Sequence, residues 1–434
     1  MIGPSKLKDL NPIEVEKIIG RNKRNLDLVK ASVQNILNDI REKGDGAILK
    51  YTKLYDGVDL TRERLKATKG DITQAYEQVP KGVVGALKEA AKNIAAVHRR
   101  QLPKAKVLKN RGGIWVKEVF KPIDRVGVYV PGGKAAYPST ALMTVIPAKI
   151  AGVGSVVACT PPLADGEIAP AVMVALDLAG ADEVYRVGGV QAIGAMAYGT
   201  ETIPRVDKIF GPGNIYVSAA KGLVYSQVGV DFLAGPSEIL IYADETADPR
   251  LIASDMVSQA EHDHDSVAVL VTTSEKTAHD TKDEIERVRA GEKRASIIEE
   301  ALSKNGAILM VEGDNEALVF INRFAPEHLE LMVKKPSRLL EKVRNAGSIS
   351  LGTYTPVPAT DYAVGSNHIL PTAGDASFTS SLTVSDFLKT TYVQSLSKGG
   401  LQKLRKTILT LAEYEGLAAH VHSVEARFIG DVRK

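Results

Sequence analysis

The middle of the chain contains a series of short apolar runs, each ending close to glycine or proline. The first runs are RVGVYVPGG, GSVVACTPP, ADEVYRVGG and VDKIFGPGN, all between residues 125 and 214. Helix-like segments separate them, and this alternation is typical of a parallel sheet covered by helices. A second series, EILIYAD, SVAVLVTT and GAILMVEG, alternates with helices expected near Pro249, Glu275 and Asn315. The sequence therefore predicts two α/β units side by side.

Different patterns flank the two series. The first hundred residues repeat apolar side chains at helical spacing, with Asn11-Pro12 as a helix start and Gly44 as a stop. Arg111-Gly112-Gly113 predicts a hairpin turn. The segment from Gly347 to Ser385, rich in Gly, Pro, Thr and Ser, predicts a long functional loop, and Gly400 to Lys434 predicts helices.

Composition limits the class of protein. The 434 residues suffice for two or three domains, and 44% apolar with 25% charged residues is the mixture of a globular chain. The stretch Ala141 to Ala164 is interrupted by Pro147 and Lys149, so no membrane helix is expected. No targeting segment is visible and there is one cysteine, which together favour a cytoplasmic protein. The basic stretch from Arg99 to Lys121 is interpreted as a solvated surface rather than a nucleic-acid site, since the net charge is only +3.

Two glycine-containing turns follow strands of the first series. Gly188 to Gln191 and Gly211 to Asn214 place backbone amides at strand-to-helix turns, where a helix N-terminus attracts phosphate. The chain has no GxGxxG after a strand and no GxxxxGK[ST]. Both interpretations therefore stay open here: a nucleotide site, or merely tight connections.

The segment SQAEHDHDS offers metal-ligand atoms. Gln259 and His262 would share a helix face, whereas His264 would join His262 only in extended backbone. Amide oxygen and imidazole nitrogen suit zinc or another first-row metal, although a hydrogen-bonded helix end is the alternative.

Other candidate groups for proton transfer or metal binding are scattered along the chain. Glu327 and His328, in APEHLEL, pair a carboxylate with an imidazole for proton transfer near neutral pH, or form an ordinary surface pair. The remaining candidates are Asp361 and His368 in the expected loop, and His420 and His422 in the tail helix, while His98 and His279 are expected to be solvated.

Cys159 lies in the apolar run GSVVACTPP with no adjacent cation. Burial in a strand predicts a raised thiol pKa and hence a poor nucleophile. Oxidation of an aldehyde by this chain is therefore expected to use attack by water rather than a thioester.

Eight segments in order resemble the histidinol dehydrogenase family, in register from about Leu28 to Val424. They are RVGVYVPGG, the stretch from Pro138 that reads PSTALMTVIPAKIAGV, IFGPGNIYVSAAKG, DFLAGPSEIL, SQAEHD, APEHLEL, DYAVGSNHILPT and EYEGLAAH. The resemblance implies a zinc-dependent, NAD-linked enzyme with one Zn²⁺ per subunit. Such an enzyme oxidises L-histidinol through the aldehyde to L-histidine, the last step of histidine biosynthesis, and reduces two NAD in succession.

The resemblance also assigns roles to residues of this chain. The metal ligands would be Gln259, His262, Asp361 and, from the partner subunit of a homodimer, His420. The proton-transfer residues would be Glu327 and His328, with His328 as the base for the alcohol and Glu327 activating water. The NAD contacts would be Tyr129, Gln191 and Asn214. The substrate contacts would be Ser237, Gln259, His262, His328, Asp361, Glu415 and His420.

The fold implied is a pair of side-by-side, incomplete Rossmann-like α/β domains with helical arms at both ends. The expected parts are an N-terminal arm over 1–25, a zinc and substrate domain over 26–128 plus 238–380, an NAD domain over 129–237, and an arm over 381–434 exchanged in a homodimer.

The sequence departs from the family pattern at two positions. Val357 stands where most members carry an acid, and His264 where the family has proline or another non-histidine residue. Relatives oxidise other small alcohols, so a dehydrogenase of another amino or sulfo alcohol is the alternative. A non-catalytic metal- or nucleotide-binding protein is a third hypothesis, but it needs neither Glu327 nor His328.

Overall fold

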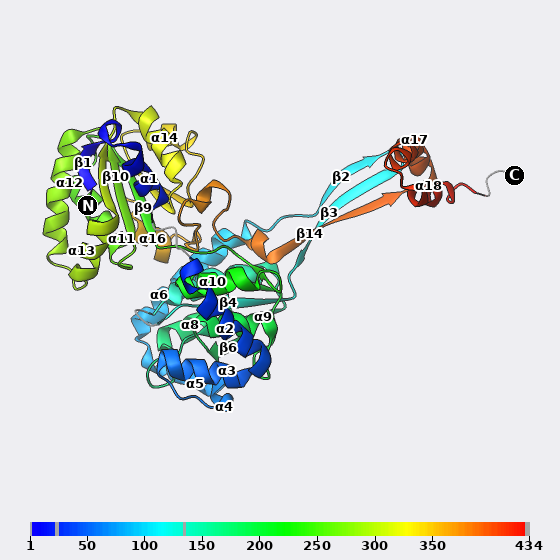
Figure 1. Ribbon diagram of the computed structural model, residues 1–434, viewed down its shortest axis with the longest axis horizontal. Helices are drawn as coiled ribbons and strands as arrows, with labels where there is room; N and C mark the ends of the chain where they lie inside the picture. The colour runs from blue at the N-terminus through cyan, green and yellow to red at the C-terminus, as the bar shows by residue number, and fades with distance from the viewer. Residues whose placement is uncertain (1, 22–25, 133–135, 430–434) are drawn as a thin grey trace. The chain divides into compact units, whose positions relative to one another are not determined.

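The computed structural model describes residues 2–21, 26–132 and 136–429; Gly133, the last glycine of the first apolar run, lies outside them. The chain divides into two compact units. The main unit comprises Met1–Gln101 and Ile123–Phe387, and the arm unit comprises Leu102–Pro122 and Leu388–Lys434. Figure 1 labels helices and strands of both units.

The strands of the main unit are β1 (Ile2–Lys6), β4 (Arg125–Tyr129), β5 (Ser155–Thr160), β6 (Glu183–Arg186), β7 (Lys208–Phe210), β8 (Gly229–Val230), β9 (Glu238–Ala243), β10 (Val267–Thr272), β11 (Gly306–Met310), β12 (His328–Met332) and β13 (Ser348–Leu351). The arm unit contains β2 (Lys106–Arg111), β3 (Ile114–Pro122) and β14 (Leu388–Leu396).

The helices of the main unit are α1 (Pro12–Gly20), α2 (Asp27–Lys43), α3 (Asp45–Tyr51), α4 (Arg62–Leu65), α5 (Lys69–Gln78), α6 (Lys81–Arg99), α7 (Pro138–Ala151), α8 (Pro170–Ala179), α9 (Gly189–Tyr198), α10 (Ile215–Val224), α11 (Pro249–Ala260), α12 (Glu275–Arg289), α13 (Ala295–Asn305), α14 (Asp314–Phe324), α15 (Pro336–Leu340) and α16 (Val357–Tyr362). Those of the arm unit are α17 (Lys398–Tyr414) and α18 (Ala418–Glu425).

The larger sheet of the main unit is parallel, with the strand order β1-β11-β10-β9-β12-β13 among the described residues. Alternate side chains of its strands point to opposite faces, as the two-residue repeat of a strand requires. Ile239 and Ile241 pack with α11, α12 and α13 on one face, whereas Leu240 and Tyr242 pack with α1 and α14 on the other. Both faces are covered, which explains why the central strands β9, β10 and β11 are largely apolar.

The second sheet of the main unit is also parallel, with the order β6-β5-β4-β7-β8. Its core includes side chains of α2, α3, α9 and α10. In Figure 1 these helices surround the sheet labelled by β4 and β6. The two parallel α/β units expected from the apolar runs are therefore confirmed.

The arm unit joins segments far apart in the sequence. Strand β3 pairs antiparallel with β2 and with β14, and α17 and α18 follow β14 (Figure 1). The β2–β3 turn contains Gly112 and Gly113, both with positive φ, so the predicted hairpin is confirmed. The basic stretch thus forms mainly a β-ribbon.

Several expectations about boundaries differ from the structure. The N-terminal arm expected over 1–25 contains strand β1, which pairs with β11, so this segment is part of the larger sheet and not only helical. Residues 26–65 pack on the second sheet, not on the larger one, because the apolar face of α2 contacts α9 and α10. The arm expected over 381–434 includes strand β14 as well as helices.

Local signals account for helix ends. Asn11 Oδ1 accepts from the Glu14 N–H at 3.0 Å while the Asn11 N–H donates to Glu14 at 2.9 Å, a capping box that starts α1. Gly44, with φ of 50°, ends α2 as predicted. Among the described residues, none of the helices combines the length and apolar character needed to cross a membrane.

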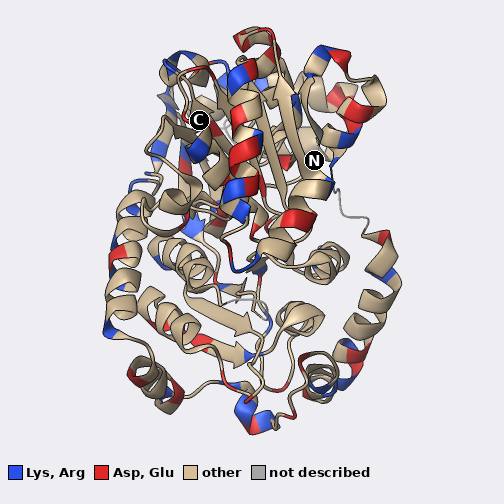
Figure 2. Ribbon diagram, turned by 90° about the vertical axis from the view of Figure 1, so that its left-hand side faces the viewer, with Lys and Arg blue, Asp and Glu red and all other residues tan. Residues whose placement is uncertain are grey.

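Charged side chains concentrate on the outer helices and loops, and few lie on the strands of the parallel sheets (Figure 2). Buried exceptions are therefore informative. Lys221 on α10 pairs with Asp231, and their side chains are 2% and 3% exposed. Lys221 also donates to the carbonyls of Gly211 at 3.0 Å and Phe232 at 2.9 Å. The pair fixes the turn that precedes α10.

Replacing Lys221 with methionine should lower the free energy of unfolding by about 3 kcal/mol, because Asp231 is left buried without its cation. Chemical denaturation of the wild type and the variant measures this loss. The control is Lys66→Met at the Lys66–Glu183 pair, whose side chains are 49% and 25% exposed, where the loss should be below about 1 kcal/mol. Equal losses in the two variants would show that the buried Lys221–Asp231 pair contributes no more to the free energy of unfolding than the exposed pair.

Candidate active site

The second sheet changes direction of winding at β4. From β4 the chain adds β5 and β6 on one side and β7 and β8 on the other. In open parallel sheets, ligands bind outside the carboxyl ends of the strands at such a switch point. Tyr129 ends β4, and the Gly211–Asn214 turn follows β7. The expected NAD contacts are therefore placed at the topologically favoured edge.

Close backbone contacts explain the glycines there. Gly211 has φ of 115°, and a Cβ at this position would lie 2.1 Å from the Tyr129 carbonyl oxygen. The Tyr129 hydroxyl accepts a hydrogen bond from the Gly189 N–H at 3.1 Å, and Gln191 is buried in the first turn of α9. Asn214 caps α10 by accepting from the N–H groups of Tyr216 and Val217 at 3.0 and 3.1 Å. Tyr129, Gln191 and Asn214 thus belong to the loops and helix starts at one sheet edge.

Asp56 also lies at this edge, and the sequence analysis missed it. Its Oδ1 would be 3.5 Å from a Cβ built on Gly188, and its Oδ2 is buried without a hydrogen-bond partner. Burial raises the pKa of Asp56 to about 6. Asp56 is the last residue of the short π-helix Thr52–Asp56 and is far from the glycine turns in sequence, so no local signal indicates its position.

The second group of expected residues lies at the opposite kind of edge, the amino edge of the larger sheet. Ser237 and Glu327 immediately precede the paired parallel strands β9 and β12, and His328 is the first residue of β12. Helix α11 returns toward the same edge, with Gln259 in its last turn and His262 just beyond it. The fold thereby gathers residues that are up to 91 positions apart, from Ser237 to His328.

Three imidazoles and two carboxyl groups gather at this edge, with Glu327 and His328 buried and His262, Asp361 and His368 half-buried. The nitrogen Nε2 of His328 lies 4.0 Å from Oε1 of Glu327, and Nδ1 of His368 lies 3.9 Å from Oδ1 of Asp361. Burial, followed by the nearby His368 and His262, lowers the pKa of His328 to about 3. His328 is therefore neutral at physiological pH and able to accept a proton.

Glu327 is held by a network behind it. Its Oε2 accepts from the Glu238 N–H at 2.7 Å, and the Glu238 carboxylate receives two hydrogen bonds of 2.6 Å from Arg21. Burial, with the neighbouring Glu238 carboxylate, raises the pKa of Glu327 well above its ordinary value. The sequence did not indicate this support, since Arg21, Glu238 and Glu327 lie in three distant segments.

Asp361 corrects one expectation about local structure. The segment expected as a loop contains β13 and the short helix α16, and Asp361 lies in α16 rather than in a loop. His368 follows in irregular structure, where its Nδ1 lies 3.1 Å from the Asp361 carbonyl oxygen. The expected solvated position of His98 is also wrong, because His98 is fully buried and contacts Asn367.

The donor set fits a metal such as zinc. Oδ1 of Asp361 is buried without a hydrogen-bond partner, so the site has an oxygen whose capacity to accept a bond is unused. Burial disfavours the carboxylate and raises the pKa of this carboxyl to about 7. Gln259, His262 and Asp361 would supply an amide oxygen, an imidazole nitrogen and a carboxylate oxygen. Within residues 2–21, 26–132 and 136–429, however, no three His, Cys, Asp or Glu side chains are arranged to hold a metal. Zinc at this position stays a prediction.

Glu415 and His420 lie in the arm unit. Glu415 follows α17, His420 is in α18, and both are exposed, as is His422. Their meeting with the buried cluster stays a prediction. His264 points elsewhere, with its Nδ1 2.8 Å from Glu300 on α13.

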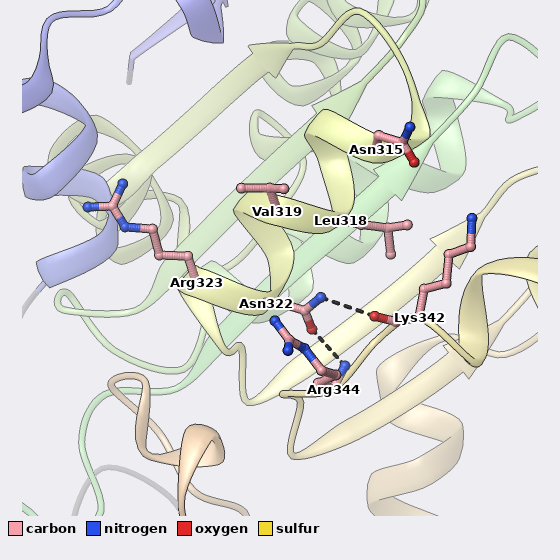
Figure 3. A pocket seen from close by; sticks show the side chains of 7 residues that line it. All are labelled: Asn315, Leu318, Val319, Asn322, Arg323, Lys342 and Arg344. Atoms are coloured by element: carbon pink, nitrogen blue, oxygen red, sulfur yellow. Dashed lines mark hydrogen bonds between the residues drawn. The ribbon is translucent and has the colours of Figure 1, made fainter.

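Cys159 is fully buried in β5, and burial raises its thiol pKa, as the sequence predicted. A surface pocket beside α14 shares no residue with the cluster around Glu327 and His328 (Figure 3). Its lining residues are Asn315, Leu318, Val319, Asn322, Arg323, Lys342 and Arg344, none of which is an expected site residue.

Glycine turns at a switch point and a neutral imidazole beside a carboxyl group are compatible with a dehydrogenase. A family model described as histidinol dehydrogenase matches residues 19–428. The chain is 46% identical over 424 residues to histidinol dehydrogenase of Methanosarcina mazei, covering 98% of this chain and 97% of the relative. It is 49% identical over 425 residues to that of Methanocaldococcus jannaschii, covering 97% and 98%.

A crystal structure of histidinol dehydrogenase from Elizabethkingia anophelis matches the fold with a TM-score of 0.93 at 37% identity, covering 96% of each chain. This chain therefore belongs to the histidinol dehydrogenase family. The resemblance seen in the eight sequence segments is confirmed.

Glu330 allows a test of the buried electrostatics next to the cluster. Burial and the adjacent Asp255 carboxyl raise its pKa to about 9, so the folded protein retains a proton that the unfolded chain releases above about pH 4.5. Stability from this group is complete at low pH and is lost as pH rises toward 9.

Glu330→Gln should therefore flatten the fall in stability between pH 5 and pH 9 and raise stability at pH 9 by on the order of 1 kcal/mol. Thermal unfolding of both proteins across this range measures the effect. Parallel profiles for the wild type and the variant would contradict the raised pKa.

Proposed function

We propose that this chain oxidises L-histidinol to L-histidine through L-histidinaldehyde, with zinc and two NAD, as the last step of histidine biosynthesis. The observation that carries the proposal is the buried Glu327–His328 cluster within a chain that matches the histidinol dehydrogenase family along nearly its full length. A cytoplasmic location accords with a biosynthetic enzyme whose one cysteine is free and buried.

His328 acts as the base that takes the alcohol proton. Its low pKa keeps the imidazole neutral, and burial excludes competing water. Glu327 then accepts a proton from the water that attacks the aldehyde. The raised pKa favours the protonated carboxyl in the resting site, and once ionised the carboxylate is a stronger base than an exposed one. The Glu238 N–H fixes the orientation of Oε2. Cys159, with its raised pKa, takes no part, in keeping with a route through water.

Gln259, His262 and Asp361, with His420 of the partner subunit, are the proposed zinc ligands. These residues would hold zinc, which would supply a fixed point of attachment for the imidazole and amino groups of the substrate. Ser237 and Glu415 are the proposed further substrate contacts, with Glu415 facing the substrate ammonium.

Tyr129, Gln191 and Asn214 are the proposed NAD contacts, supported by their place at the switch point of the second sheet. These residues would hold NAD, which would serve as the hydride acceptor for both oxidations. The backbone amides of the Gly211–Asn214 turn, at the start of α10, would be suited to the negative charge of the pyrophosphate.

A homodimer with exchanged arms is supported by the surface of the arm unit. Within the described helices α17 and α18, Gly400 and Ala412 are the buried positions. Large apolar side chains are exposed instead, and they include Tyr392, Leu396, Leu411, Tyr414 and Leu417. An apolar surface of this kind is typical of a subunit interface, and we propose a second copy of this chain as its partner.

Purified protein with zinc, NAD and L-histidinol should form about two NADH per histidinol consumed, because the alcohol-to-acid oxidation transfers two hydrides. Absorbance of NADH, with histidine measured in parallel, gives the ratio. A ratio near one would contradict the second oxidation. No NADH from histidinol, with turnover of another amino or sulfo alcohol, would favour the alternative substrate.

Mixing subunits tests the exchanged arm. An inactive His420→Asn chain and an inactive His328→Asn chain should regain about a quarter of the wild-type activity after random subunit exchange, because half of the dimers then have one intact site. The matched control mixes His262→Asn with His328→Asn. Both residues come from the same main unit, so no site is intact and no activity should return. Equal results from the two mixtures would overturn the exchange.

A further inference from the structure

The buried carboxyl group of Glu330 pairs with that of Asp255, which is half-buried, and the proposed mechanism uses neither group. Glu330 lies on β12 and is 1% exposed, in a strand whose other side chains are apolar except His328. Its carboxyl group is in hydrogen-bonding contact with that of Asp255 on α11. Two carboxyl groups in such contact avoid mutual repulsion only if they share a proton.

The pair also contacts a third element. Oε1 of Glu330 accepts a hydrogen bond from the Val357 N–H at 3.0 Å, and Val357 is the first residue of α16. This N–H is one of the groups at a helix start that has no partner within its own helix. One side chain on β12 therefore connects α11, β12 and α16.

Each of these contacts lies one structural repeat along its helix or strand from a candidate functional residue. Asp255 is one helical turn before Gln259, and Val357 is one helical turn before Asp361. Glu330 is one strand repeat after His328. Because α11 and α16 run toward the amino edge of the sheet while β12 runs away from it, all three contacts lie one layer beneath the cluster.

We propose that the Asp255–Glu330 pair is a positioning device that sets the spacing of the metal ligands on α11 and α16 relative to His328. The inference rests on the proposed zinc site and adds residues that touch neither substrate nor metal. Without the pair, α16 would lose its hydrogen bond to β12 through the Val357 N–H. The distances from Asp361 to Gln259 and His262 would then no longer be fixed. Supporting groups of this kind typically change metal affinity 10- to 100-fold, which is the magnitude expected for their removal.

Two substitutions of Glu330 distinguish the effect of its hydrogen bonds from the effect of its side-chain volume. In Glu330→Gln the amide oxygen still accepts from Val357 and the amide nitrogen donates to Asp255, whereas Glu330→Met keeps the volume and loses both contacts. Competition with a chromophoric chelator on the full-length protein should give Glu330→Gln the zinc affinity of the wild type, within about 2-fold, and Glu330→Met a loss of about 10-fold or more.

Hydrogen exchange on the metal-free protein supplies a readout that does not depend on zinc. The peptide that contains Val357 should exchange faster in Glu330→Met than in the wild type, with Glu330→Gln unchanged. Asp255→Leu, which breaks the pair from α11, should also weaken zinc binding and serves if Glu330→Met does not fold.

Two control variants complete the design. Asp45→Ala removes another buried carboxylate, which accepts from Thr202 in a different part of the main unit, and it should lower stability without changing zinc affinity. His262→Asn removes a proposed ligand and should abolish tight zinc binding.

Unchanged zinc affinity and unchanged exchange in Glu330→Met would overturn the positioning role while leaving the proposed function intact. Loss of zinc affinity equal in Glu330→Gln and Glu330→Met would also overturn it. Absence of tight zinc binding in the wild type would instead overturn the proposed metal site, and the inference with it.

Discussion

The buried ion pair between Arg21 and Glu238 is the contact on which the candidate active site depends. Arg21 follows α1, and its guanidinium group binds both carboxylate oxygens of Glu238, donates to the Phe324 carbonyl at 2.9 Å and lies 3.4 Å above the Phe324 ring. Glu238 in turn positions Glu327 through its N–H and accepts from the Ala373 N–H at 2.8 Å. Removal of either partner would leave an uncompensated charge directly behind the proposed proton-transfer residue.

The two halves of the proposed chemistry use the two ends of parallel strands. The NAD contacts lie at the carboxyl ends of β4 and β7, where helix starts and glycine turns present backbone N–H groups. The cluster lies at the amino edge of the larger sheet, where strand starts and helix ends present side chains. Backbone dipoles suit a pyrophosphate at the first edge, whereas buried imidazole and carboxyl groups with shifted pKa values suit proton transfer at the second.

Much of the fold could be predicted from the sequence because the signals are local. Apolar runs that end at glycine or proline predicted β4 to β7 and β9 to β11, and Gly44 predicted the end of α2. Strand β1 was missed because IGPSK lacks an apolar repeat, and α16 was missed because six residues in a Gly-, Pro- and Thr-rich segment show no helical period. The apolar face of α2 showed that the helix is buried but not which sheet covers it.

Some site residues could likewise be proposed from the sequence, and others could not. Glu327 and His328 could be proposed from an adjacent carboxylate and imidazole, and the family resemblance supplied the proposed ligands. The residues that set the pKa values and orientation of the site could not be proposed from the sequence. They are Arg21, Asp56, Asp255 and Glu330, and they act through contacts between distant segments. A charged residue inside an otherwise apolar strand, as in HLELM, is the one sequence signal that could have indicated Glu330.

The most direct measurement is a crystal structure of the zinc-loaded protein with anomalous diffraction collected at the zinc edge. The account predicts one zinc per subunit, bound by Gln259, His262 and Asp361 of one chain and by His420 of the partner subunit. Zinc held by four residues of a single chain, or located away from the Glu327–His328 cluster, would contradict it.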